Sequence, residues 1–168
     1  MTDLVIIDIE ATGLESKSVP IEIAWVCGKS NEHDSFLINP ESANWDHWTL
    51  EAEMIHGIPR GRCIKDGISI YEAVNRLNSQ LRGCIVLSDA APFDFNWLKQ
   101  LFNAAKTEMD FSIMGIDQFL ELTKQSHEKI YNFHKAKFSK SIPHRALADC
   151  RLIKKSLISA KIIHNNNE

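Results

Sequence analysis

The spacing of apolar residues changes along the chain, and the change separates strands from helices. Residues 4–10 are rich in β-branched side chains on both alternating faces, which is typical of a strand inside a sheet. Residues 20–28 and 33–39 predict two further strands. The polar segment 28–31 is short enough for an antiparallel hairpin, so the chain is predicted to open with an antiparallel meander.

Helical spacing appears in the middle of the chain. A loop with a short helical piece at residues 49–56 comes first. Apolar side chains then recur at helical spacing from Ser69 to Gly83, which predicts an amphipathic covering helix. Residues 84–87 predict a short buried strand, and Pro92 opens the next helix at a position that tolerates proline. A strand followed by a helix indicates a parallel crossover.

The last third of the chain completes an α/β pattern. Residues 111–114 are a candidate fifth strand, residues 116–137 are mostly helical with one break, and residues 146–162 predict a final helix. Three antiparallel strands, followed by strands that alternate with helices, predict a mixed five-stranded sheet flanked by helices. We expect one domain over residues 1–162 and a polar tail over residues 163–168.

Composition narrows the class of protein. The 168 residues are 44% hydrophobic and 24% charged, which suffices for one packed core. The net charge of −3 excludes a polybasic protein that binds nucleic acid by bulk electrostatics, so binding of a polyanion would be local. The four cysteines stand far apart, without the spacing of a zinc site or a disulfide framework, and we expect them to be reduced.

The sequence predicts a cytoplasmic protein without a membrane span. Its longest unbroken apolar run, residues 23–27, is far shorter than the roughly 18 residues needed to cross a bilayer. Residues 1–3 lead directly into a strand and lack the basic region and the apolar core of a secretory signal.

Two acids interrupt the most apolar strand. Asp8 and Glu10 are two residues apart, so their side chains project from the same face. Buried carboxylates are costly unless they take up protons or meet cations, and hard divalent ions bind carboxylate oxygens readily. The alternative is that both acids lie at a strand end and are solvated, and the pair alone does not decide.

Two further acids and a histidine come from distant segments. Asp94 lies in the first turn of the helix that Pro92 opens, where helix capping is a serious alternative. Asp149 is flush with the apolar stripe of the last helix, so its carboxylate should point inward and needs a partner. His144 lies in the loop before that helix and can accept a proton at neutral pH.

Three short motifs resemble those of a known family. Residues 8–14 (DIEATGL), 93–98 (FDFNWL) and 144–149 (HRALAD) are similar to the three ordered motifs of the DEDDh exonucleases. This family includes ribonuclease T, oligoribonuclease and the proofreading subunits of replicative polymerases. The resemblance implies an RNase H-like fold and a 3′–5′ exonuclease that releases 5′-mononucleotides from single-stranded DNA or RNA.

The resemblance also implies a role for each motif residue. It makes four acids the ligands of two Mg²⁺ or Mn²⁺ ions, and these are Asp8, Glu10, Asp94 and Asp149. His144 becomes the general base. The residues that it implies for substrate binding are Ala11, Thr12, Gly13, Leu14 and His56. Leu14 would contact the terminal base, and ordinary core packing is its alternative.

Some features depart from the family pattern or leave alternatives open. Ala11 stands where many members have threonine, and Asp89 rivals Asp94 as a metal ligand. Residues 129–145 combine basic and aromatic side chains without an acid, which suits either a path for a single strand or a solvated helix face.

Two other functions remain as alternatives. A catalytically silent binding module on the same fold would usually have lost at least one of the acids, and none is missing. An RNase H-like endonuclease would also use clustered acids, but His144 argues against it. A homodimer is compatible with the resemblance, because several relatives pair as dimers.

Overall fold

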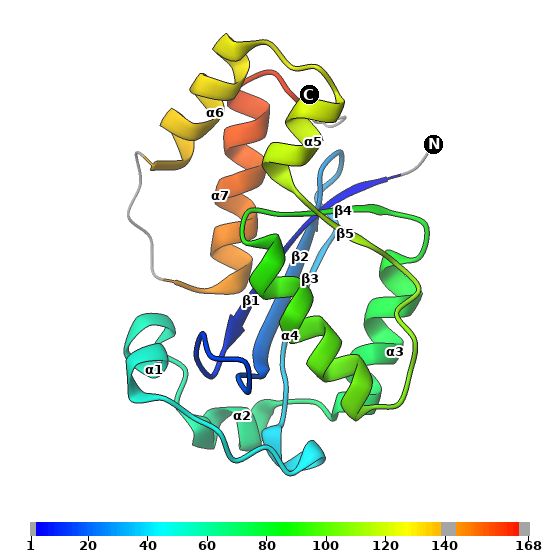
Figure 1. The fold of residues 1–168 in the computed structure, drawn as a ribbon, viewed down its shortest axis with the longest axis vertical. Helices are drawn as coiled ribbons and strands as arrows, with labels where there is room; N and C mark the ends of the chain where they lie inside the picture. Colours follow the sequence, from blue (N-terminus) through cyan, green and yellow to red (C-terminus); the bar gives the residue numbers. More distant parts are fainter. Residues whose placement is uncertain (1–2, 139–143, 165–168) are drawn as a thin grey trace.

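The structure is a computed structural model that describes residues 3–138 and 144–164, and its centre is a mixed five-stranded sheet (Figure 1). The strands are β1 (Leu4–Ala11), β2 (Pro20–Cys27), β3 (His33–Leu37), β4 (Ile85–Ser88) and β5 (Ile113–Gly115). Their order across the sheet is β3-β2-β1-β4-β5. β1 pairs antiparallel with β2 and parallel with β4, so the predicted fold class is confirmed.

Helices of different lengths connect the strands. They are the 3₁₀ helix η1 (Pro40–Ala43) and the α-helices α1 (Leu50–His56), α2 (Arg60–Asp66), α3 (Ile70–Leu81), α4 (Ala91–Ala104), α5 (Ile116–Leu122), α6 (His127–Phe138) and α7 (Ala146–Ser159). Local signals set several boundaries. The Thr49 hydroxyl caps the start of α1, and Gly57 ends that helix with a φ of 66°. Ser69 caps α3 in the same way.

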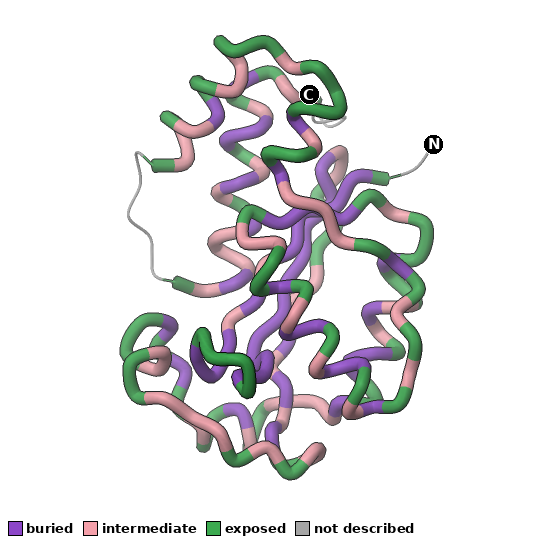
Figure 2. Tube along the Cα trace, in the orientation of Figure 1, coloured by how far each residue is buried: buried purple, intermediate pink, exposed green. Residues whose placement is uncertain are grey.

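Two apolar layers hold the helices against the sheet. Along β1, Val5, Ile7 and Ile9 face the core formed with α3 and α4. The alternate residues Leu4 and Ile6 face the core formed with α5, α6 and α7. Figure 2 shows β1 and β2 as largely buried strands at the centre of the molecule. Since side chains alternate along a strand, the even-numbered positions of β1 point toward the side of the sheet that α7 covers.

Some elements differ from the predictions, and each difference has a local cause. Strand β5 begins at Ile113 rather than at Phe111. The ring of Phe111 packs against that of Phe102, with 6.0 Å between the centroids, so Phe111 is apolar because it belongs to the core and not because it lies in a strand. Helix α7 ends at Ser159 rather than at residue 162, and Lys161 follows with a φ of 55°.

Two short helices were not predicted at all. α2 has no side-chain cap, and Cys63 is its one buried residue, so it lacks both of the usual sequence signals. η1 lies in a segment for which the sequence predicts a loop. The predicted break within residues 116–137 is present, because α5 and α6 are separate helices.

Within the described ranges, no helix is both long and apolar enough to span a bilayer. Residues 165–168 of the predicted tail lie outside the described part of the chain. The domain boundary at residue 162 stays a prediction.

Candidate metal centre

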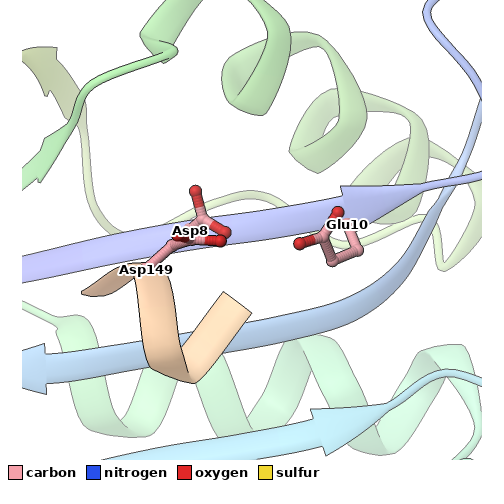
Figure 3. A group of neighbouring side chains, drawn as sticks. All are labelled: Asp8, Glu10 and Asp149. Carbon is pink, nitrogen blue, oxygen red and sulfur yellow. The ribbon is translucent and has the colours of Figure 1, made fainter. Parts of the chain in front are cut away.

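Three carboxylates from β1 and α7 meet at one side of the sheet (Figure 3). Asp8 and Glu10 occupy even-numbered positions of β1 and therefore point toward the side covered by α7. Asp149 lies in the first turn of α7 and points back toward them. One carboxylate oxygen of each residue lies within 4.8 Å of the others. The predictions that Asp8 and Glu10 share a face, and that Asp149 points inward, are confirmed.

Asp94 lies beside this group but not within it. It is 1% exposed in the first turn of α4, and its Oδ2 accepts a hydrogen bond from the Ser88 hydroxyl. Its buried Oδ1 has no hydrogen-bond partner among the described residues. Buried polar atoms are rarely left unpaired, so this oxygen is suited to complete a cation site next to Asp8.

Asp89, the rival of Asp94, has a different environment. Its carboxylate forms an ion pair with Lys137. It lines, together with Asp8 and Asp149, a hollow of about 380 Å³ that we call the acidic hollow. Because a cation of the protein already pairs with Asp89, the environment favours Asp94 as the metal ligand.

Burial and mutual repulsion raise the pKa of these carboxyl groups. Burial is the largest cause for Asp8, whose pKa lies well above its usual range, and the charge of Asp94 comes next. Burial followed by the charge of Asp149 raises the pKa of Glu10 to about 7. Burial likewise raises the pKa of Asp94 to about 8. Without a compensating cation, the site therefore disfavours its full negative charge.

His144 also lines the acidic hollow, directly before α7. It is exposed, so its ring is accessible from solvent. Burial raises the pKa of Asp149, and the nearby His144 is the first of the influences that oppose this rise. His144 thus lies around one hollow with Asp8, Glu10 and Asp149, the acids of the first and third motifs, whereas Asp94 of the second motif does not line it.

An ion pair that was not predicted from the sequence, between a buried glutamate and a partly exposed arginine, fixes the start of α7. Glu22 of β2 is 3% exposed and accepts hydrogen bonds from Arg145 Nε at 2.9 Å and Nη2 at 2.5 Å. It also accepts the backbone N–H of Ala146 at 3.0 Å, which caps a helix end that has no side-chain cap of its own. Glu22 faces Glu10 across the sheet. An acid inside an otherwise apolar strand was the signal that could have revealed it.

A second hollow of about 320 Å³ adjoins the first and contains four of the predicted substrate-binding residues. Ala11, Gly13, Leu14 and His56 line this apolar hollow, together with residues of α1 and Trp97 of α4. Glu10 lines both hollows. Leu14 is 73% exposed, which excludes core packing as its role.

Thr12 and His56 have defined hydrogen bonds. Thr12 is fully buried and does not line the apolar hollow, and its hydroxyl accepts the N–H of Val19. His56 Nδ1 accepts the N–H of Ile58 at 3.0 Å, so its proton lies on Nε2. That Nε2 is buried without a partner among the described residues. Burial lowers the pKa of His56 and keeps the ring neutral.

The basic and aromatic segment 129–145 lies partly beside the acids. Lys137 and Phe138 of α6 line the acidic hollow, and Lys135 lies over the ring of Tyr131. Residues 139–143, including Lys140, are outside the described residues. The described part of the segment thus contributes one side of the hollow.

The fold and the acid cluster together define an α/β protein with a candidate site for divalent metal. Comparison with known families shows that the sequence profile of the RNase T exonuclease family matches residues 5–157. The chain therefore belongs to this exonuclease family, as its motifs suggested. No curated protein matches it.

Solved structures of exonuclease I share the fold. The complex of E. coli exonuclease I with a dA16 oligonucleotide has a TM-score of 0.76 at 16% identity, over 96% of this chain and 41% of that one. The zinc-bound complex of the E. coli enzyme with single-stranded DNA has a TM-score of 0.74 at 15% identity, over 96% of this chain and 41% of that one. Exonuclease I from Methylocaldum szegediense has a TM-score of 0.67 at 18% identity, over 92% of this chain and 39% of that one. This chain thus spans about two fifths of each of these longer chains.

Proposed function

We propose that this protein is a metal-dependent 3′–5′ exonuclease that releases 5′-mononucleotides from single-stranded DNA. The observation that carries the proposal is the convergence of three acids from β1 and α7, next to a fourth, Asp94 of α4, whose buried Oδ1 has no hydrogen-bond partner in the described part of the chain. Membership of the exonuclease family and the fold shared with exonuclease I support it. The choice of DNA rests on the oligonucleotides in the exonuclease I complexes.

The donor set fits hard divalent cations. Asp8, Glu10, Asp94 and Asp149 offer carboxylate oxygens, the ligands that Mg²⁺ and Mn²⁺ prefer. Two bound ions would supply charge neutralisation at the scissile phosphate and lower the pKa of an attacking water. His144 takes the proton of that water on an imidazole nitrogen. The water oxygen bonds to phosphorus, the bond to the 3′ oxygen of the penultimate nucleotide breaks, and that oxygen leaves and is protonated.

The apolar hollow accounts for attack at an end of the strand. Because Glu10 lines both hollows, a terminal nucleotide held in the apolar hollow has its phosphate next to the acids. Leu14 offers apolar contact to the terminal base. The buried Nε2–H of His56 offers one hydrogen bond to an oxygen of that nucleotide.

The test is digestion of 5′-labelled linear and circular single-stranded DNA with Mg²⁺, alongside RNA of the same sequence. We expect a ladder from linear DNA, mononucleotide products and no cleavage of circles. Asp8→Asn and His144→Ala should each abolish the ladder, whereas the matched control Asp46→Asn, at an exposed acid outside both hollows, should not. Internal cuts in circles would favour the endonuclease, and binding without any ladder would favour the silent module.

Three finer points belong to the same proposal. Titration with Mg²⁺ and Mn²⁺ would establish which ion is used, and calorimetry would count the ions. The four cysteines are free, in keeping with the proposed cytoplasmic location. The expected homodimer gains no support from the matches, and the proposed reaction uses residues of one chain only.

A further inference from the structure

A third hollow lies between α7 and the turn that joins β2 to β3. Its volume is about 480 Å³, and we call it the basic hollow. Three basic residues of α7 line it, namely Arg151, Lys154 and Lys155. His33 and the polar turn residues line its other side, and Glu32 is the one acid among the lining residues.

Hydrogen bonds hold two of these cations without neutralising them. Lys154 Nζ donates to the backbone carbonyl of Ser30. Arg151 Nη2 lies 3.2 Å from His33 Nε2. His33 Nδ1 lies 2.8 Å from the Asn31 carbonyl and donates to it, so Nε2 is the acceptor for the arginine. Both charged groups are therefore fixed by neutral partners.

The positive charge of the basic hollow lacks a carboxylate partner in the described part of the chain. None of the three α7 cations lies within 4.0 Å of a described carboxylate oxygen, Glu32 included. Cations elsewhere do pair, for example Arg76 with Asp34. In a protein of net charge −3, fixed and unpaired cations around a hollow are a local site for an anion.

We propose that the basic hollow binds backbone phosphates of the single strand, upstream of the end that lies at the acids. This inference rests on the proposed function, since it takes the ligand to be the same strand. Arg151 and Lys155 follow Asp149 by two and six residues. Their side chains therefore leave α7 at roughly 200–240° around the helix axis from the side chain of Asp149. The basic hollow is thus on another flank of α7 from the acidic hollow, so only a strand longer than a few nucleotides can occupy both.

The test compares short and long strands in variants of the full chain. The double variant Lys154→Gln/Lys155→Gln removes two charges from the basic hollow. The matched control Lys65→Gln/Lys99→Gln removes two exposed charges that line none of the three hollows. Affinity is measured by fluorescence anisotropy without divalent metal, on a tetranucleotide and on a twenty-nucleotide strand of DNA. Cleavage of both strands is measured separately with Mg²⁺.

We expect the double variant to lose about tenfold in affinity for the long strand. Because two phosphate contacts are lost, the slope of the logarithm of the binding constant against the logarithm of the salt concentration should become smaller by about 1.4. Binding and cleavage of the tetranucleotide should match the native protein, and the control should match it on both strands. Unchanged affinity for the long strand, or an equal loss in the control, would overturn the inference.

Two further outcomes separate this inference from neighbouring possibilities. If inorganic phosphate alone raises the melting temperature of the native protein but not of the double variant, while long-strand affinity is unchanged, the hollow takes a free anion and the strand assignment is wrong. If no strand is cleaved, the proposed function fails. The anisotropy comparison still decides whether a strand binds there.

Discussion

The exposure of Leu14 separates binding from packing at the scale of a single residue. Because its side chain is 73% exposed, Leu14→Ala should change the free energy of unfolding by less than about 0.5 kcal/mol. The same change should raise KM for single-stranded DNA several-fold and leave kcat nearly constant, since it removes apolar contact to the terminal base. Steady-state kinetics and urea unfolding check both parts. Leu122→Ala, at an exposed leucine that lines none of the three hollows described above, is the control and should change neither.

Asp34 shows how single partners tune the pH dependence of stability. Burial alone would raise the pKa of Asp34, but hydrogen bonds from Arg76 and Gln80 outweigh it and lower the pKa. A lowered pKa stabilises the fold above the unfolded value of about 3.9, and this contribution is lost as the pH falls through the folded value. Asp34→Asn should therefore cost about 1 kcal/mol at pH 7, a value reduced by partial exposure of the pair.

The difference between native protein and the Asp34→Asn variant isolates this group from other acids that titrate in the same range. Urea unfolding at pH 7 and near pH 3 measures it at both ends of the window. The stability gap should shrink at the lower pH. A gap of equal size at both values would contradict the assignment. Asp66→Asn breaks an exposed pair with Arg62 and should have little effect at either pH.

At the scale of elements, the sequence predicted what depends on local periodicity. The two-residue repeat of β1 placed Asp8 and Glu10 on one face, and the 3.6-residue repeat of α7 turned Asp149 inward. The pair of Glu22 and Arg145 could not be predicted in this way. Those residues are 123 positions apart, and their contact depends on where the start of α7 meets β2. The hydrogen bond that His56 accepts from Ile58 is local, but it depends on the shape of the turn after α1, which the repeat of apolar residues does not specify.

The ion pair between β2 and α7 should respond unequally to loss of each partner. Glu22 is buried and Arg145 is partly exposed, so an unpaired glutamate costs more than an unpaired arginine. Arg145→Met should destabilise the metal-free protein by about 3 kcal/mol. Glu22→Gln, which keeps an acceptor for the N–H of Ala146, should cost about half as much. Urea unfolding at pH 7 measures both, and equal costs or the reverse order would contradict the asymmetry.

Loss of this pair should also reduce turnover, because His144 directly precedes Arg145 at the start of α7. We expect kcat to fall by more than KM changes in both variants. Arg145→Lys, which keeps the charge and one hydrogen bond, should recover part of the turnover. A variant that loses stability without losing kcat would mean that the pair holds the helix but does not position His144.

At the scale of the whole molecule, the three hollows border shared elements. Glu10 of β1 joins the acidic hollow to the apolar one, and α7 separates the acidic hollow from the basic one. The two apolar layers keep these elements in place, since β1 and α7 each contribute to a buried core. The arrangement of the three hollows therefore depends on the global fold. Conversely, a change of one charge at the centre of the sheet should change the free energy of unfolding of the entire domain.

Asp8→Asn should abolish activity and, at the same time, increase the stability of the metal-free fold. The native side chain places a buried carboxylate beside three others, which destabilises the metal-free fold, and asparagine keeps its shape without the charge. We expect the variant to be inactive and, without metal, more stable by about 1–2 kcal/mol. Mg²⁺ should raise the melting temperature of the native protein, because it binds only the folded acids, and should have much less effect on the variant. Differential scanning calorimetry with EDTA and with Mg²⁺ measures both effects. An inactive variant that is less stable without metal would mean that Asp8 supports the fold through hydrogen bonds, and equal responses to Mg²⁺ would mean that the ion binds elsewhere.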